Sequence, residues 1–229
     1  MKKTIVVLSG AGISQESGIA TFRDSDGLWE NHSIEDVATP QGFKKNPALV
    51  LDFYNKRREQ LKDVKPNQGH LILARLEKHF NVEIITQNVD DLHERAGSTK
   101  ILHLHGELKK MRSVKNPSVF FDCENDIILG DLAADGGQLR PHIVWFNEDV
   151  PLIEKAVELV CQADFFVVVG TSLQVYPAAG LTQFVPKDTL VYVIDPNQVE
   201  GDSLKNAVKI IEKATIGLQI FEEMVMETS

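Results

Sequence analysis

Two histidines stand together in the segment His103-Leu104-His105, and imidazole is the side chain best suited to proton transfer near neutral pH. On a strand both would lie on one face, because strand side chains alternate with a period of two. At a strand end, His105 could act as a general base. A structural histidine bonded to a backbone carbonyl is the competing interpretation, and it is favoured for a lone histidine. A metal site is disfavoured, because no carboxylate or cysteine has a spacing that completes a ligand set.

A glycine-rich segment, GAGIS at 10–14, follows the first apolar run of the chain. Glycines after a first strand let the backbone come close to a pyrophosphate, and backbone N–H groups can bind its negative charge. The spacing differs from the usual G-x-G-x-x-G, because Gln15 stands where the third glycine belongs. A tight turn between a strand and a helix explains this segment equally well.

Two further polar segments, QNVD at 87–90 and GTS at 170–172, also follow apolar runs directly. The amide and carboxylate of the first could bind a carboxamide or ribose hydroxyls. The small hydroxyl residues of the second could bind phosphate or ribose. Taken singly, each segment could instead cap the helix that follows it.

The elements that would position these segments are strands of a parallel sheet. The runs Thr4–Leu8, Val82–Thr86, Phe165–Val169 and Leu190–Ile194 are rich in valine and isoleucine and lack alternation, as in strands covered on both faces. A fifth strand is predicted over Ile101–Leu104. Helical patterns cover Gln68–Phe80, Leu152–Gln162 and the region around Pro47–Leu61. We therefore predict an α/β fold with a Rossmann-like, doubly wound parallel sheet, whose strand ends converge on one dinucleotide site.

The length of 229 residues suits a single domain with a small inserted module. We assign the Rossmann-like core to 1–30, 67–108 and 141–229. The insertions 31–66 and 109–140 would form the small module, the second of them as loops with short strands.

The composition narrows the partners and the compartment. A net charge of −9 argues against nucleic acid or an anionic membrane as the main partner. Apolar runs fall well short of the roughly 20 residues that a membrane helix needs. The two cysteines, Cys123 and Cys161, form no disulfide framework. We therefore expect a cytoplasmic protein, and we expect it to be a monomer.

Seven segments together resemble the sirtuin family. They occur in the family's order and span nearly the whole chain: GAGIS (10–14), GIATFRDSDGLW (18–29), PNQGH (66–70), TQNVDDLHERAGS (86–98), HLHGEL (103–108), LRPHIVWFNE (139–148) and GTSLQVYPAAG (170–180). The resemblance implies an NAD-dependent protein-lysine deacylase that consumes NAD and releases nicotinamide and O-acyl-ADP-ribose. Its partners would be acylated lysines on protein substrates.

The resemblance also implies roles for individual residues. His105 would deprotonate a ribose hydroxyl, and Asn88 would line the nicotinamide pocket; both are expected to be catalytic. The expected cofactor-binding residues are Gly10, Ala11, Gly12, Ile13, Ser14, Thr21, Phe22, Arg23, Trp29, Gln87, Asn88, Asp90, Gly170, Thr171, Ser172 and Asp195. The acylated peptide would add as a strand, on one side along Val144, Trp145 and Phe146 and on the other along Val175 and Tyr176.

Tyr54 and Arg57 are three positions apart on a predicted helix and therefore share a face. A guanidinium beside a phenol can bind a carboxylate. The desuccinylating and demalonylating branch of the family carries such a pair at the end of its acyl channel, so the resemblance implies a preference for acidic acyl groups. The alternative is a solvated basic face, since Lys56, Arg57 and Arg58 form a charge run.

The chain departs from the family in the region that corresponds to 109–140. Most sirtuins hold a structural zinc there with two cysteine pairs, whereas this region contains only Cys123. We predict no structural zinc, and we expect an apolar core to replace it, built from Phe120, Phe121 and residues 127–129. The family's usual glycine at position 147 is Asn147.

Two other functions compete with deacylation. One is mono-ADP-ribosyl transfer to protein, which uses the same cleavage of NAD. The other is a non-catalytic NAD-binding regulatory module, which would fit if the small module had lost its integrity along with the zinc cysteines.

Overall fold

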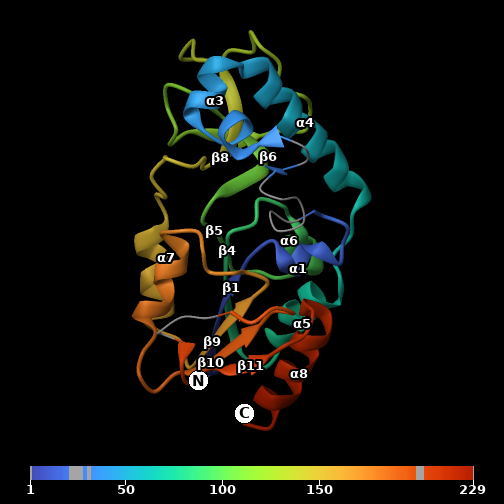
Figure 1. Cartoon of the computed structure of the whole chain (residues 1–229), viewed down its shortest axis with the longest axis vertical. Helices are drawn as coiled ribbons and strands as arrows, with labels where there is room; N and C mark the ends of the chain where they lie inside the picture. Colours follow the sequence, from blue (N-terminus) through green and yellow to red (C-terminus); the bar gives the residue numbers. More distant parts are fainter. Residues whose placement is uncertain (1, 21–27, 30–31, 200–203, 229) are drawn as a thin grey trace.

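The computed structural model describes residues 2–20, 28–29, 32–199 and 204–228. Its centre is a six-stranded parallel sheet with the strand order β11-β10-β9-β1-β4-β5 (Figure 1). The strands are β1 (Thr4–Ser9), β4 (Asn81–Thr86), β5 (Ile101–His103), β9 (Phe165–Val169), β10 (Leu190–Ile194) and β11 (Val208–Ile210). This confirms the predicted Rossmann-like fold and the five predicted strands, although β5 ends one residue early.

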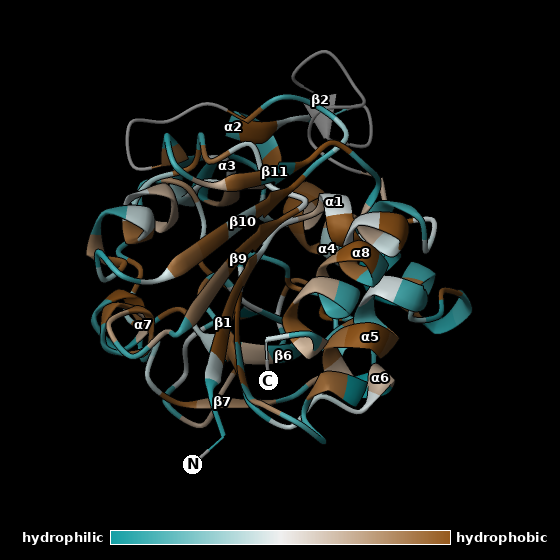
Figure 2. Cartoon of the chain, turned by 90° about the horizontal axis from the view of Figure 1, so that it is seen from below, coloured by the Kyte–Doolittle hydropathy of each residue, from teal (hydrophilic) through white to brown (hydrophobic). Residues whose placement is uncertain are grey.

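Both faces of the sheet are buried, as the uninterrupted apolar runs predict. Side chains of β1 alternate between two cores: Ile5 and Val7 enter one, and Val6 and Leu8 enter the other. Helices α5 (Gln68–Leu76) and α8 (Ala214–Met226) cover the first face, and α7 (Ile153–Val160) with the 3₁₀ helix η1 (Ala178–Phe184) covers the second (Figure 2). In the described ranges, no helix combines the length and the apolar character needed to cross a membrane.

The edge of the sheet at β11 and the helix α8 were not predicted. In α8 the buried residues Leu218, Phe221 and Val225 follow a helical spacing, so a signal was present in the sequence. Gly217 lies on the same buried face of α8. A Cβ at this position would lie 2.2 Å from Cγ2 of Ile194, so glycine lets the helix pack closely on β10.

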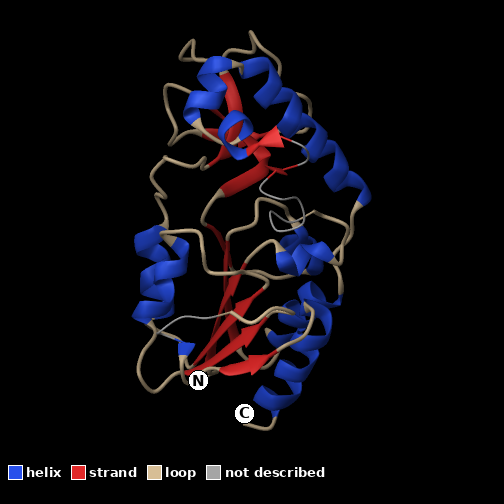
Figure 3. Ribbon diagram, viewed as in Figure 1, coloured by secondary structure: helices blue, strands red, loops and turns tan. Residues whose placement is uncertain are grey.

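A second, antiparallel sheet lies beyond the carboxyl ends of the parallel strands (Figure 3). Its order is β7-β6-β8, formed by Phe120–Asp122, Gly106–Ser113 and Leu139–Ile143. Around it lie α2 (Ile34–Val37), α3 (Pro40–Lys45) and α4 (Pro47–Asp63), and a short ladder joins β2 (Leu28–Trp29) to β3 (His32–Ser33). The sequence predicted loops with short strands over 109–140; the structure has the short strand β7 between loops there, and β6 also continues into this region as far as Ser113.

Helix α4 does not present a solvated basic face. It carries two buried polar pairs, Tyr54 with Arg57 and Asn55 with Arg58. Arg57 and Arg58 are only 8% and 4% exposed, whereas Lys56 remains in solvent. Asn55 donates to the carbonyl of Ile127 (2.9 Å) and accepts from its N–H (3.0 Å). Arg58 donates to the carbonyl of Leu108 (3.0 Å) and to Oδ1 of Asn55 (2.9 Å). We call Asn55 and Arg58 the α4 clamp, because they fasten the 123–127 loop to the helix.

The predicted apolar core of the small module is wrong in most of its members. Phe120 and Phe121 are 46% and 48% exposed, and residues 128 and 129 are more exposed still. Ile127 alone is buried, together with Cys123 and Leu51. The prediction failed because hydrogen bonds from the α4 clamp, rather than a run of apolar side chains, fix this loop.

Candidate functional site

A cavity of about 790 Å³ lies at the carboxyl ends of the parallel strands, between the two sheets. It is the point of convergence that the sequence predicted. Predicted cofactor residues that line it are Gly10, Ala11, Gly12, Ser14, Gln87, Asn88, Asp90, Gly170, Thr171, Ser172 and Asp195. Also in its lining are His105 and the predicted substrate residues Tyr54, Arg57, Val144, Trp145, Phe146, Val175 and Tyr176.

Five predicted cofactor residues are not placed in this lining. Ile13 is buried in the core beneath the sheet. Thr21, Phe22 and Arg23 lie outside the described residues, and of Trp29 only the backbone, in β2, is described.

Two glycine-containing turns form one wall of the cavity, and they pack directly on each other. A Cβ at Gly12 would lie 2.7 Å from Cα of Gly170, and a Cβ at Gly170 would lie 2.3 Å from the nitrogen of Ile13. The N–H groups of Gly10 and Gly12 donate to the carbonyls of Val169 and Gly170. The expectation that these N–H groups face a phosphate is therefore wrong for Gly10 and Gly12. What these glycines contribute is the absence of a Cβ, which lets the two turns pack directly on each other.

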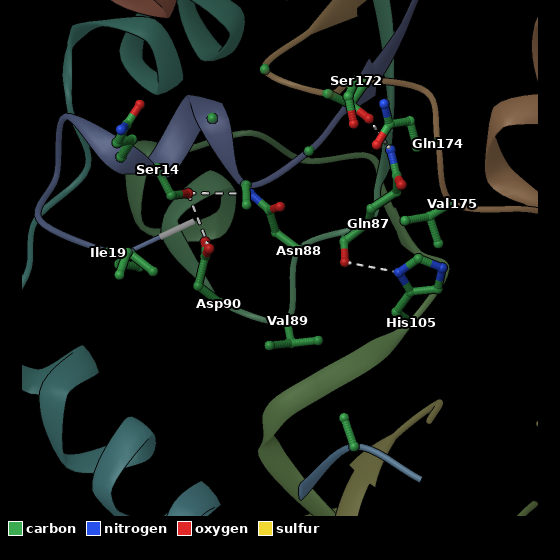
Figure 4. Close-up of a pocket in the computed structure, with 18 of the residues that line it drawn as sticks. Ser14, Ile19, Gln87, Asn88, Val89, Asp90, His105, Ser172, Gln174 and Val175 are labelled. Atoms are coloured by element: carbon green, nitrogen blue, oxygen red, sulfur yellow. Dashed lines mark hydrogen bonds between the residues drawn. The ribbon is translucent and has the colours of Figure 1, made fainter. Parts of the chain in front are cut away.

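Asn88 and Asp90 both meet the hydroxyl of Ser14, which comes from α1 (Gly12–Gln15) (Figure 4). The Ser14 hydroxyl donates to Oδ2 of Asp90 (3.0 Å) and accepts from the amide nitrogen of Asn88 (3.2 Å). Asp90 also accepts from the N–H of Leu92 at the start of α6 (Leu92–Ala96), as the helix-cap interpretation held. Burial raises the pKa of Asp90, and the bonds from Leu92 and Ser14 act in the opposite direction.

Two buried histidines stand behind this cluster, and the sequence reasoning gave them no role. His70 places Nε2 3.4 Å from the Ser14 hydroxyl, and His93 places Nε2 3.0 Å from the Ser9 hydroxyl. Their ring centroids are 5.0 Å apart. Burial lowers the pKa of His70 to about 4, so both rings remain neutral near pH 7. The sequence did contain a signal for them, because His70 and His93 each lie within a polar segment, PNQGH and DLHERAG respectively.

His105 reaches the cavity from a turn between β5 and β6, not from the strand itself. Its Nδ1 lies 3.1 Å from the carbonyl of Gln87 (Figure 4). That contact assigns the ring proton to Nδ1 and leaves Nε2 as a proton acceptor. Burial lowers the pKa of His105, which favours the neutral ring. Gly106 makes the turn possible with φ of 83°, and a Cβ there would lie 2.0 Å from the carbonyl oxygen of His142.

His103 does not share this position, which corrects the predicted pairing on one face. Its Nε2 lies 2.7 Å from Glu94, and its Nδ1 lies 3.2 Å from the carbonyl of Asn88. The argument that no carboxylate is suitably spaced is also wrong, because ligand atoms of Glu94, His103 and Glu107 lie within 4.8 Å of one another. The spacing in the sequence did not reveal this group, because Glu94 lies in helix α6 and approaches His103 of β5 only in the folded chain.

Tyr54 and Arg57 lie at the end of the cavity formed by the small module. The indole Nε1 of Trp145 donates to the Tyr54 hydroxyl at 3.0 Å. Burial raises the pKa of Tyr54 above its usual value, although the positive charges of Arg140 and Arg57 oppose this. The two side chains that the sequence placed on one helix face therefore line the cavity together.

Trp145 is held by a buried ionic network. Glu148 accepts from the Trp145 N–H (2.8 Å) and from Nη1 of Arg140 (2.7 Å). Arg112 reaches the same carboxylate at 3.2 Å. Asn147, which lies between Trp145 and Glu148 in the sequence, adopts φ of 69°, a left-handed conformation that glycine takes freely and asparagine tolerates. This explains how asparagine replaces the family's usual glycine.

The expected peptide groove has a constraint that the sequence could not show. The N–H groups of Val144 and Phe146 donate to the carbonyls of His105 and Ala38. A peptide strand on this side would therefore depend on carbonyl oxygens of the 144–147 segment rather than on these N–H groups.

Comparison with known proteins gives a consistent result. A model of the Sir2 family matches residues 10–177. A Helicobacter pylori (strain ATCC 700392 / 26695) protein named NAD-dependent protein deacylase is 59% identical over 217 residues, which are 95% of this chain and 95% of the relative.

Solved structures show the same likeness. The crystal structure of a Sir2 homologue with NAD matches with a TM-score of 0.87 and 36% identity, covering 99% of this chain and 91% of that chain. A complex of Sir2 with a p53 peptide and NAD+ matches with a TM-score of 0.79 and 29% identity, covering 99% and 93%.

Proposed function

Because the chain belongs to the Sir2 family, we propose that it is an NAD-dependent protein deacylase that acts on acylated lysine and accepts acidic acyl groups such as succinyl and malonyl. The name of the H. pylori relative supports the reaction, and the Sir2 complex with a peptide and NAD+ supports a protein substrate. One observation carries the proposal. A neutral histidine, an amide–carboxylate cluster and a tyrosine–arginine pair all line the same cavity.

The residues present fit NAD. Gly10, Gly12 and Gly170 line the cavity with backbone alone, and their lack of a Cβ lets the two turns pack directly on each other. Asn88 and Asp90 supply nearly buried polar groups suited to a carboxamide and to hydroxyls. When bound, NAD supplies the glycosidic bond to nicotinamide that is broken in the reaction.

The residues of the chain then perform three tasks. Asn88 and Asp90, held by Ser14, orient the nicotinamide end. His105, with Nδ1 turned to the Gln87 carbonyl, accepts a ribose hydroxyl proton at Nε2. The carbonyl of Gln87 then stabilises the imidazolium that this transfer creates.

Recognition of an acidic acyl group rests on Arg57 and Tyr54. A guanidinium and a phenol can bind a carboxylate through charge-assisted and neutral hydrogen bonds, respectively. Both side chains are buried, and at a buried site water competes less for such hydrogen bonds. An acetyl group has no terminal carboxylate, so neither Arg57 nor Tyr54 strengthens its binding.

The experiment measures nicotinamide release with one peptide sequence that carries succinyl-, acetyl- or unmodified lysine. We expect release only with the acylated peptides. Loss of a charge-assisted hydrogen bond lowers an affinity by roughly 10- to 100-fold, so Arg57→Met should reduce the succinyl-to-acetyl ratio of kcat/KM by about that factor.

Lys56→Met is the matched control, since it removes a neighbouring charge that points into solvent. It should leave the ratio unchanged. Equal losses on both acyl groups in Arg57→Met would contradict recognition of the carboxylate. Release of nicotinamide without any acylated peptide would contradict a deacylase.

A further inference from the structure

Trp145 contacts Tyr54, one member of the proposed acyl-recognition pair. We propose that Trp145 is a positioning residue for acyl specificity: its indole N–H makes Tyr54 an acceptor on one side and thereby turns the phenol proton toward the substrate carboxylate. The inference rests on the proposed function, because it assigns a direction to a hydrogen bond at the same site.

The direction of the Trp145–Tyr54 bond is fixed by chemistry. An indole nitrogen only donates, whereas a phenol both donates and accepts. At 3.0 Å, the indole N–H must therefore point to the Tyr54 oxygen. A phenol O–H lies near the plane of its ring and has two favourable positions there. The incoming N–H disfavours one of them, so the proton takes the other.

The indole is itself rigidly held, which gives the bond a fixed geometry. The Arg140 guanidinium stacks over the indole ring at 3.1 Å from its centroid. Glu148 holds the backbone N–H of Trp145, and the ring of Phe43 lies 5.1 Å away. Trp145 is 2% exposed, so water does not compete for its N–H. The orientation of the phenol is therefore set before any substrate binds.

A fixed phenol proton matters for one class of substrate. A carboxylate accepts hydrogen bonds and repels an oxygen lone pair. Without the indole N–H, the restraint that this bond places on the phenol proton is lost, and a lone pair of the phenol can face the acyl carboxylate. An acetyl group carries no such charge, so its turnover depends much less on the orientation of the phenol.

The test is a double-mutant cycle of Trp145→Phe and Tyr54→Phe, with kcat and KM measured on succinyl and acetyl peptides. Phenylalanine keeps an aromatic ring under Arg140 and removes the N–H. In the wild-type background, Trp145→Phe should lower the succinyl-to-acetyl ratio of kcat/KM by about tenfold, mainly through the KM of the succinyl peptide. In the Tyr54→Phe background, it should not lower that ratio further, because the phenol is gone.

A second replacement guards against a folding defect. Benzothienylalanine incorporated at position 145 keeps the bicyclic shape and replaces the N–H with sulfur, and it should reproduce the tenfold change in the ratio. A purely structural role would lower both substrates alike, and it would do so equally in both backgrounds. Either result overturns the inference.

The two proposals fail in different ways. If Arg57→Met is selective but removal of the indole N–H is not, the inference about Trp145 falls and the proposed function stands. If Arg57→Met is unselective as well, recognition of acidic acyl groups falls, and the role of Trp145 falls with it.

Discussion

The reactivity of His105 depends on which of its nitrogens carries the proton. The Gln87 carbonyl lies beside Nδ1, so the proton belongs there and the lone pair belongs on Nε2. Burial favours the neutral ring and lowers the pKa below the ordinary value of 6.5. The Gln87 contact selects the tautomer that leaves Nε2 free to accept a proton, and although this contact raises the pKa, burial outweighs it and keeps the ring neutral.

This assignment predicts the pH dependence of the reaction. A base is active when deprotonated, so a lowered pKa keeps it active into more acidic solution. We expect the acid limb of kcat/KM for NAD, at saturating acetyl peptide, to fall below pH 6.5. The acetyl substrate avoids titration of the acyl carboxylate, and circular dichroism at each pH controls for unfolding. An acid limb centred above pH 6.5 would contradict a buried neutral His105.

At this scale, sequence reasoning identified chemistry better than orientation. It selected His105, Asn88 and Asp90 because polar residues followed apolar strands. It did not foresee that His103 would turn to Glu94, because their contact depends on a helix and a strand meeting in space. Nor could it foresee the Trp145–Tyr54 bond, which joins positions 91 residues apart.

At the scale of elements, α4 is the clearest case in which one helix serves two purposes. Tyr54 and Arg57 line the cavity, whereas the α4 clamp holds the 123–127 loop. The Asn55 amide satisfies both the N–H and the carbonyl of Ile127. Removing it would leave two buried backbone groups without these bonds.

We therefore expect Asn55→Ala to lower the free energy of unfolding by about 2 kcal/mol, measured by urea denaturation. Lys56→Ala, on the exposed side of the same helix, should change it by less than about 0.5 kcal/mol. If both variants proved equally stable, the α4 clamp would not be what orders the loop.

The elements themselves were predicted unevenly. Uninterrupted valine and isoleucine runs located the buried strands, because only strands covered on both faces are so apolar. β6 was not predicted because its sequence, GELKKMRS, is rich in charged residues, although only Lys109 is fully exposed. Burial on one side leaves a weaker pattern, and a register shift between Glu107 and Met111 weakens it further.

On the scale of the whole molecule, the small module keeps its shape through several separate contacts. Besides the α4 clamp, the Ser113 hydroxyl donates to Asp135, which also accepts from the N–H of Gly137. Cys123 packs with Leu51 and Ile127. These contacts stand in the region where most members of the family hold zinc.

We predict that removing divalent metals leaves the fold intact. Dialysis against a chelator should change neither the melting temperature nor acyl-dependent nicotinamide release, because no folding free energy comes from a zinc–thiolate site. Elemental analysis of the purified protein provides the independent measurement. One zinc per chain, or unfolding on chelation, would contradict this prediction.

The sharing of α4 has a consequence for how the enzyme would lose its discrimination. We expect warming or mild denaturant that releases the 123–127 loop to loosen helix α4, which carries the proposed acyl-recognition pair, while the glycine turns across the cavity remain attached to the parallel sheet. Desuccinylation would therefore be lost before deacetylation, and the ratio of the two rates would report how well ordered the small module is.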